Sequence, residues 1–335
     1  MRKRLDVLIC GGGACISSHS HEFKDRLVEQ IAAKELTDEI SLVETGCMGP
    51  CQFGPMMVTY PDGSFYINLK EEHAAQIVEE HFLKGRPVRP LLWLTPEARK
   101  IVEEKKQIPF FEKQLKIVLA NCGRIDPENI EEYITQRGYE ALGTLLGSMT
   151  PEQVIEVVTK SGLKGRGGAG FPTGVKWKFA RQNPVKDKYI ICNADEGDPG
   201  AFMDRAVCEG DPHAVLEGMA IAGYAIGADR GYIYVRAEYP LAIDRLTTAI
   251  KQAREMGLLG KNIFEKGFDF DVEIRVGAGA FVCGEETALI ASIEGMRGQP
   301  RPKPPFPANK GLWQKPTIIN NVETLASIRH IFLNG

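Results

Sequence analysis

The regular alternation of strand and helix patterns after residue 150 constrains the fold more than any other feature. Apolar runs and helical periods alternate as strand 188–192, helix 213–226, strand 231–235, helix 241–256, strand 272–276 and helix 285–294. Strands that alternate with helices of these lengths pair in parallel, and the helices cover both faces of the sheet. Residues 151–335 are therefore predicted to form an α/β domain, whose first helix begins at the capping sequence Thr150-Pro151-Glu152.

A second, smaller domain is expected, because 335 residues exceed what one hydrophobic core usually supports. The N-terminal part predicts strand 5–9, helix 21–34, strands 40–44 and 56–60, a hairpin at Asp62-Gly63 into 64–68, and helix 71–82. The run GRPVRP from Gly85 ends this pattern as a linker does. We expect a first domain over 1–85, a charged helical connector over 86–150 that packs on the second domain, and the α/β domain over 151–335.

Composition excludes several classes of protein. Apolar residues make up 43% and charged residues 25%, with a net charge of -3, so there is no basic surplus for binding nucleic acid. No run of about 18 apolar residues occurs, and the apolar run after the basic start MRKR is too short for a signal peptide. We expect a cytoplasmic protein without direct membrane insertion, in which cysteines serve as metal ligands or buried thiols.

Four of the eight cysteines form two spaced pairs in glycine-rich turns. Four residues separate Cys10 from Cys15, and three separate Cys47 from Cys51. Glycine backbone N–H groups can approach and hydrogen-bond the sulfurs of a metal site. A structural zinc site and four plain buried thiols are the alternatives, although zinc sites usually use tighter C-x2-C spacing. The unpaired cysteines are expected to be buried thiols: Cys122, Cys192, Cys208 and Cys283.

The stretch GRGGAGFPTG, residues 165–174, matches the G-x-G-x-x-G pattern of dinucleotide-binding loops. A Rossmann loop follows a strand and opens a helix, whereas this one follows the amphipathic stretch EQVIEVVTKSGLK, so the ordinary Rossmann interpretation fails. A glycine backbone beside Arg166, Phe171 and Lys176 can still face an anion or lie flat against a ring. We interpret it as a nucleotide-contacting loop, and a purely structural loop is the alternative.

Three further stretches carry carboxylates, amides and glycines after strands or at helix starts: NADEGDPGAFMDR from Asn193, GAFVCGEETAL from Gly279 and IINNVETLA from Ile318. The carboxyl ends of parallel strands lie at one sheet edge, where α/β proteins bind ligands, so we expect these stretches to meet. Carboxylates can accept hydrogen bonds from ribose or ribityl hydroxyls, and the Asn320 and Asn321 amides can donate to a phosphate. Solvated loops are the alternative for the acidic runs.

Both parts of the chain resemble known families. The first domain is similar to the thioredoxin-like 2Fe-2S ferredoxin module, in element order and in C-x4-C and C-x3-C spacing, which implies a 2Fe-2S cluster on Cys10, Cys15, Cys47 and Cys51. Residues 108–335 resemble the FMN- and NADH-binding flavoprotein subunit of respiratory complex I and its hydrogenase and formate dehydrogenase relatives. Five motifs occur in that family's order: the four stretches above and RPKPPFPA from Arg301.

The second resemblance implies FMN and a nicotinamide nucleotide, NAD(H) or NADP(H), as ligands. Positions matching those around FMN are Gly165, Gly167, Lys176, Asn193, Asp195, Glu196, Gly284, Glu285, Asn320, Asn321 and Thr324. Positions matching those around the nucleotide are Phe171, Phe179, Lys303 and Phe306. Arg166, Gly168, Asp198, Phe281 and Glu286 complete the predicted cofactor-binding set. The predicted catalytic positions are Glu196 and Glu286, and the resemblance places Glu286 where flavin and nucleotide meet. The implied reaction is hydride exchange between nicotinamide and flavin, followed by single-electron transfer to iron-sulfur clusters.

The sequence departs from the family pattern at two places. The family's flavoprotein continues into a C-x2-C-x2-C motif for a 4Fe-4S cluster, and this sequence has no such motif up to Gly335. Asp198 and Phe281 stand where many relatives have Glu and Tyr. Because Asp198 is the shorter acid near the nucleotide, the choice between NAD and NADP stays open.

Because a ferredoxin module is fused to its N-terminus, the chain is more similar to the diaphorase subunit of multisubunit hydrogenases or formate dehydrogenases than to the subunit of complex I. Electron-bifurcating enzymes are included in that group. The partners implied are a catalytic hydrogenase or formate dehydrogenase subunit, another thioredoxin-like 2Fe-2S subunit, and ferredoxin. The competing hypothesis is a non-enzymatic iron-sulfur electron carrier or nucleotide-sensing module, which binds the nucleotide without oxidising it.

Overall fold

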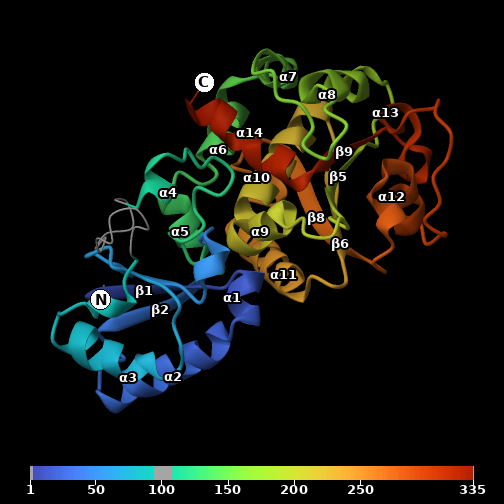
Figure 1. The fold of residues 1–335 in the computed structure, drawn as a ribbon. Coiled ribbons are helices and arrows are strands. Elements are labelled where there is room, and N and C mark those ends of the chain that lie inside the picture. Colours follow the sequence, from blue (N-terminus) through green and yellow to red (C-terminus); the bar gives the residue numbers. More distant parts are fainter. Residues whose placement is uncertain (1–2, 94–107, 335) are drawn as a thin grey trace. The chain divides into compact units, whose positions relative to one another are not determined.

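The computed structural model describes residues 3–93 and 108–334, apart from the side chain of Pro109 (Figure 1). The chain forms two compact units, Met1–Asp126 and Pro127–Gly335. Residues 94–107 of the predicted connector lie outside the described residues. None of the described helices is long and apolar enough to span a membrane.

The first unit is built on a four-stranded sheet with the order β2-β1-β3-β4. Strand β1 (Leu5–Cys10) pairs in parallel with β2 (Ile40–Thr45) and antiparallel with β3 (Met57–Tyr60), which forms a hairpin with β4 (Phe65–Tyr66). The other elements of this unit are α1 (Gly13–Ser17), α2 (Ser20–Ala33), η1 (Cys51–Phe53), α3 (His73–Ile77), η2 (Val78–Leu83), η3 (Arg89–Leu91) and α4 (Pro109–Glu112).

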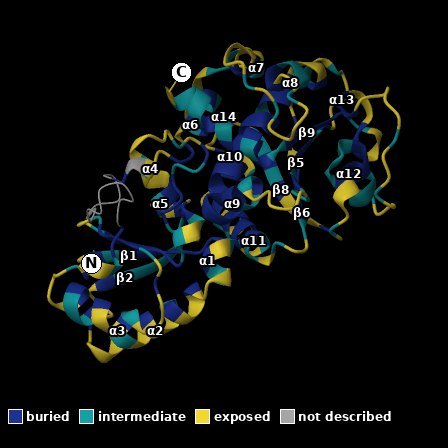
Figure 2. Cartoon of the chain, in the orientation of Figure 1, coloured by how far each residue is buried: buried dark blue, intermediate teal, exposed yellow. Residues whose placement is uncertain are grey.

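Alternation along β1 sends side chains to two apolar cores, one on each face of this sheet. Val7 and Ile9 pack with Phe23 and Leu27 of α2, whereas Leu8 packs in a separate cluster on the other side. Figure 2 shows the consequence for α2, along which buried and exposed residues alternate as expected for an amphipathic helix. The strands and helices predicted over residues 5–82 are confirmed, with ends displaced by a few residues.

The segment after the described gap differs from the expectation that the connector packs on the second domain. Ile108 is fully buried and, with Phe111, packs beside Leu8, Val58 and Phe65 in the second core of the first unit. The physical reason is that this face of the sheet is apolar and needs a cover, which the sequence after residue 107 provides. Among the described helices of the predicted connector, α5 (Ile130–Thr135) and α6 (Glu140–Ser148) belong to the second unit. The domain boundaries at residues 85 and 150 stay predictions.

The second unit is built on a five-stranded sheet with the order β7-β8-β6-β5-β9. Its strands are β5 (Tyr189–Ala194), β6 (Arg230–Arg236), β7 (Gly260–Ile263), β8 (Phe268–Gly277) and β9 (Thr317–Asn321), all parallel except β7. Its helices are α5 (Ile130–Thr135), α6 (Glu140–Ser148), α7 (Pro151–Lys160), α8 (Thr173–Gln182), α9 (Met203–Gly210), α10 (Pro212–Ile226), α11 (Pro240–Glu255), η5 (Phe281–Gly284), α12 (Glu286–Ile293), α13 (Pro307–Lys310), η6 (Leu312–Gln314) and α14 (Val322–Asn334).

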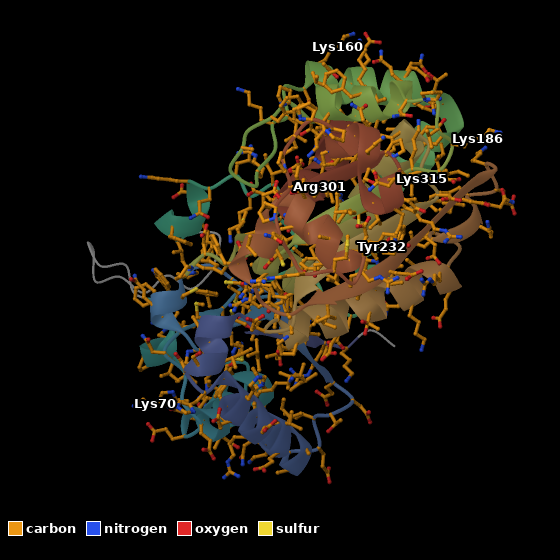
Figure 3. The ribbon with its side chains drawn as sticks, turned by 90° about the vertical axis from the view of Figure 1, so that its right-hand side faces the viewer. Lys70, Lys160, Lys186, Tyr232, Arg301 and Lys315 are labelled. Atoms are coloured by element: carbon orange, nitrogen blue, oxygen red, sulfur yellow. The ribbon has the colours of Figure 1, made fainter. Side chains whose placement is uncertain are left out.

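Helices cover both faces of this sheet, which confirms the predicted α/β class. On one face, Ile191 and Tyr232 pack against Leu289 and Ile290 of α12, and Tyr232 is labelled in Figure 3. On the other side lies α10, which is buried along nearly its whole length in Figure 2 and packs on β5, β6 and β8. The crossing of α10 and α14 is tight, because a Cβ added at Gly218 would lie 2.1 Å from a backbone oxygen of α14.

Candidate functional site

The four paired cysteines gather at the carboxyl ends of β1 and β2. Cys10 closes β1, Cys15 lies in α1, and Cys47 and Cys51 follow β2. The Cys47 and Cys51 sulfurs are 3.9 Å apart, and Cys10 hydrogen-bonds both Cys15 and Cys47. The bond with Cys15 raises the pKa of Cys10 to about 12, and burial adds to this rise. The sequence thus brings together the four thiols that it predicts as ligands.

The surroundings of these thiols suit a cluster with sulfur ligands. The backbone N–H of Met48 donates to Cys10 Sγ at 3.4 Å, and backbone groups of Met56 and Gly49 hydrogen-bond Cys15 and Cys47. A Cβ at Gly54 would lie 2.8 Å from Cys15 Sγ, so glycine is needed for this close approach. Amide donors of this kind stabilise negative charge on cluster sulfurs. Within residues 3–93 and 108–334, no three His, Cys, Asp or Glu side chains surround a single-ion position.

A cavity of about 1000 Å³ opens in the second unit, at the carboxyl ends of β5 and β9. Its wall contains most of the predicted cofactor-binding residues: Gly165, Gly167, Phe171, Lys176, Phe179, Asn193, Gly284, Glu285, Glu286, Lys303, Phe306, Asn320 and Asn321. Except for Lys176 and Phe179 of α8, these residues come from the five separated motifs. The expectation that the motifs share one edge of the sheet is therefore met for these residues.

The glycine-rich loop forms one side of this cavity and is fixed at both ends. Gly165 N–H donates to the Phe171 carbonyl at 2.9 Å, and Arg166 N–H donates to Thr324 Oγ1 at 2.9 Å. A Cβ at Gly167 would lie 3.4 Å from the Cβ of Asn321. Gly168 has φ +95°, which favours glycine. The loop leads into α8 rather than following a strand, as the sequence indicates.

Two lysines and two glutamates form a charged group in the cavity wall. Glu286 pairs with Lys176 at 3.3 Å and with Lys303 at 2.8 Å, and Lys303 also pairs with Glu285 at 3.1 Å. Burial raises the pKa of Glu286, but the two ammonium groups outweigh it, so the pKa lies below its ordinary value. Glu285 also caps α12 by accepting hydrogen bonds from the Thr287 and Ala288 amides. These four charges balance one another within the wall.

Three phenylalanines present exposed rings around the cavity. Phe171, Phe179 and Phe306 are 48%, 51% and 55% exposed. Large apolar side chains are seldom left this exposed together, and a planar heteroaromatic ring could cover them by stacking.

Three asparagines of the wall form hydrogen bonds within the protein. Asn193 Nδ2 donates to the Gly284 carbonyl at 2.9 Å, and Asn320 Oδ1 accepts from Trp177 Nε1 at 2.9 Å. Asn321 caps α14 by accepting from Thr324 N–H at 3.3 Å, and its Nδ2 donates to Asp204 at 2.5 Å. The Asn321 amide, predicted as a phosphate donor, is thus engaged within the protein.

The remaining predicted residues lie outside the cavity wall: Arg166, Gly168, Asp195, Glu196, Asp198, Phe281 and Thr324. Glu196, predicted to be catalytic, accepts hydrogen bonds from the backbone N–H groups of Asp204 and Arg205 at the start of α9. Asp195 pairs with Arg236 at 3.0 Å. Thr324 acts on the glycine-rich loop through its hydroxyl. The roles of all these residues stay predictions.

Sequence reasoning missed several residues around the cavity. Asp204 is 8% exposed and accepts from Asn321, and Arg236 joins Asp195 to the Gly279 carbonyl. Trp177 is fully buried and holds Asn320. Asp204 lies within a stretch singled out for its acidic residues, so its charge was a usable signal, whereas the contact of Trp177 gives no local signal. Asp204, Arg236 and Trp177 support the wall without lining the cavity. The wall residues outside the predicted set are Ala169, Gly170, Gln182, Asn183, Pro184, Pro307, Ala308, Asn309 and Ile319.

Comparison with known proteins bears on both units. The family model of the Nuo51 FMN-binding domain matches residues 158–330, just over half of the chain. The model of the thioredoxin-like [2Fe-2S] ferredoxin matches residues 2–81.

Curated relatives match about two thirds of the chain. The NADP-reducing hydrogenase subunit HndC of Solidesulfovibrio fructosivorans is 66% identical over 223 residues, which cover 67% of this chain and 45% of the relative. An NADH-quinone oxidoreductase subunit of Aquifex aeolicus (strain VF5) is 53% identical over 226 residues, which cover 68% of this chain and 53% of the relative. The chain therefore spans about half the length of these relatives.

Among solved structures, a NAD+-reducing [NiFe]-hydrogenase in the H2-reduced state is similar over 100% of this chain and 53% of its own, with TM-score 0.55 and 28% identity. The family models match the cavity's motifs and the cysteine loops in separate parts of the sequence. The chain therefore belongs to the family of the Nuo51 FMN-binding domain, preceded by a thioredoxin-like [2Fe-2S] ferredoxin domain, and FMN and a 2Fe-2S cluster are its cofactors.

Proposed function

We propose that the chain is an NAD(P)H-oxidising subunit, which exchanges hydride with a nicotinamide nucleotide and single electrons with iron-sulfur clusters. The observation that carries the proposal is the cavity of about 1000 Å³, in which a glycine-rich loop, three exposed phenylalanines and a lysine–glutamate group face one space. FMN, when bound there, supplies the conversion between a two-electron hydride and single electrons.

The protein's own residues divide into three kinds of contact. The backbone of Gly165 and Gly167 allows a flat ring or a phosphate to approach without side-chain interference. Phe171, Phe179 and Phe306 offer faces on which an adenine can stack. The Glu286 carboxylate, held between Lys176 and Lys303, is rigid enough to orient a nucleotide hydroxyl or carboxamide.

We further propose that the chain works within a larger complex. Its partners would be a catalytic hydrogenase or formate dehydrogenase subunit, another 2Fe-2S subunit, and ferredoxin if the complex bifurcates electrons. Support comes from the 66% identity to a hydrogenase subunit and from the similarity to a NAD+-reducing hydrogenase. Purification of the native assembly, followed by identification of its subunits and measurement of its flavin and iron content, tests this part.

The test of the activity is anaerobic addition of NADH, and separately of NADPH, to the full chain loaded with FMN. Rapid loss of flavin absorbance with one or both nucleotides is expected. The Phe179→Ala variant should need about tenfold more nucleotide, because base–aromatic stacking contributes about 1–3 kcal/mol. The matched control is Phe264→Ala, which removes an exposed ring of the same unit outside the cavity wall and should respond like the wild type.

The alternatives give different results in this experiment. A nucleotide that binds without reducing the flavin would favour the nucleotide-sensing module. If the wild type and Phe179→Ala both bind FMN and show the same weak loss of flavin absorbance with nucleotide, the proposed nucleotide position is contradicted.

A further inference from the structure

Residues 108–125 return to the cysteine loops of the first unit, although the ferredoxin model matches only residues 2–81. Thr45, just before the second cysteine pair, donates through Oγ1 to the Ile125 carbonyl at 2.8 Å and accepts from Gly123 N–H at 3.0 Å. The ring of Phe110 would lie 3.3 Å from a Cβ at Gly49, between Cys47 and Cys51. This downstream segment, defined as residues 108–125, is therefore part of the cluster's surroundings.

The downstream segment brings one cation against these loops. Lys116 Nζ donates to the Met48 carbonyl at 3.2 Å, and its ammonium lies 5.1 Å from the centre of the Phe111 ring. The Lys116 side chain is partly buried, and a Cβ at Gly49 would lie 3.6 Å from Nζ. A cation in such a place is screened by water much less than a surface lysine.

The Met48–Gly49 peptide connects this cation to a cluster ligand. Its carbonyl accepts from Lys116, and its N–H, which belongs to Gly49, hydrogen-bonds the sulfur of Cys47. Gly49 has φ +118°, a conformation that side chains with a Cβ rarely adopt, so glycine permits this peptide orientation. A hydrogen bond to the carbonyl polarises the peptide and strengthens the hydrogen bond from its N–H.

We propose that Lys116 is a positioning residue for the 2Fe-2S cluster, which raises the cluster's reduction potential through the Met48–Gly49 peptide. Reduction adds one electron and therefore one negative charge to the cluster and its sulfur ligands. The ammonium and the polarised N–H stabilise the reduced form more than the oxidised form, so the potential rises. The proposal rests on the cluster in the first unit and is independent of the proposed NAD(P)H oxidation.

The test is an anaerobic redox titration of the full chain, in which electron paramagnetic resonance follows the reduced 2Fe-2S signal. The variants are Lys116→Met, which keeps much of the apolar stem, Lys116→Gln and the charge-conserving Lys116→Arg. Loss of one charge-assisted hydrogen bond should make reduction about tenfold less favourable in the neutral variants, which is a fall of about 59 mV for a one-electron couple. Lys116→Arg should stay near the wild-type potential.

The control is Lys113→Gln, which removes the same charge from an exposed position of the downstream segment and should leave the potential unchanged. Iron content and visible absorbance establish that each variant holds its cluster. A neutral variant with an intact cluster and the wild-type potential overturns the proposal. If neither neutral variant holds a cluster, Lys116→Arg decides. A wild-type potential supports the proposal, and a fall of about 59 mV in the potential, as expected for a neutral variant, contradicts it. Flavin bleaching by nucleotide should be unchanged in all variants.

Discussion

Asp204 should make the stability of the second unit depend on pH. Its carboxylate lies at the start of α9, 8% exposed, and accepts hydrogen bonds from Asn321 Nδ2 and from Glu323 N–H at 3.3 Å. Burial raises the pKa of Asp204 from 3.8 to about 7, and the neighbouring Glu196 carboxylate adds to the rise, against the two hydrogen bonds. The folded protein thus holds this proton at pH values where the unfolded chain has released it.

The sign and size of the effect follow from these two pKa values. The stability that this group contributes is fully present below pH 3.8 and is lost as the pH rises through about 7. A shift from 3.8 to about 7 is about 3 pKa units, and at about 1.36 kcal/mol per unit the total is about 4 kcal/mol. About 2.5 kcal/mol of it should be lost between pH 5 and pH 8 by the same linkage relation.

The assay is equilibrium urea unfolding of the FMN-free full chain at several pH values from 5 to 8, followed by far-UV circular dichroism. Asp204→Asn removes the titrating group. The free energy of unfolding of the variant minus that of the wild type should therefore be about 2.5 kcal/mol larger at pH 8 than at pH 5. The lost hydrogen bond to Asn321 adds an offset that does not depend on pH. Asp244→Asn, on the exposed side of α11, should show no such gain. A constant difference between Asp204→Asn and the wild type from pH 5 to 8 would refute the reasoning.

Three further predictions concern the cluster, the cavity and a helix start. Cys47→Ser should lose most of the bound iron and visible absorbance, whereas Cys208→Ser, which changes a buried thiol of the second unit, should keep both. Gly167→Val should weaken FMN binding at least about tenfold in a fluorescence titration, because a branched side chain would occupy cavity space; Gly147→Val, with nothing within 4 Å of the added Cβ, should bind normally. Thr150→Ala removes the capping box of α7 and should lower the free energy of unfolding by about 1 kcal/mol, read from urea midpoints; an unchanged midpoint would contradict it.

Much of the fold is predictable because it follows from local periodicity. The runs at 188–192 and 231–235 became β5 and β6, and the capping sequence at Thr150 begins α7 with both hydrogen bonds of a capping box. Strand β7 was not predicted, because Gly260–Ile263 is short and carries two exposed polar residues, and its pairing with β8 is a tertiary contact. The packing of Ile108 and Phe111 on the first unit was missed for the same reason.

The site shows where sequence reasoning succeeds and where it stops. Carboxylates, amides and glycines near strand ends mark Asn193, Glu285 and Asn321 as site candidates, because parallel sheets bind ligands at this edge. Glu285 and Asn321 also cap helices there. The residues that hold the site by hydrogen bonds and ion pairs have no comparable sequence pattern. Trp177 resembles any buried aromatic residue in sequence, and Arg236 resembles any charge at a strand end.

The pairs that shape the cavity join residues far apart in the chain. Arg166 is held by Thr324, 158 residues away, Trp177 holds Asn320 over 143 residues, and Asn193 holds the carbonyl of Gly284 over 91 residues. Each pair exists only when the sheet has assembled, so the wall of the cavity is a property of the whole second unit and not of any one motif. The glycine-rich loop therefore fails as a Rossmann signal and still lines the cavity, because β9 and α14 place it there rather than a preceding strand.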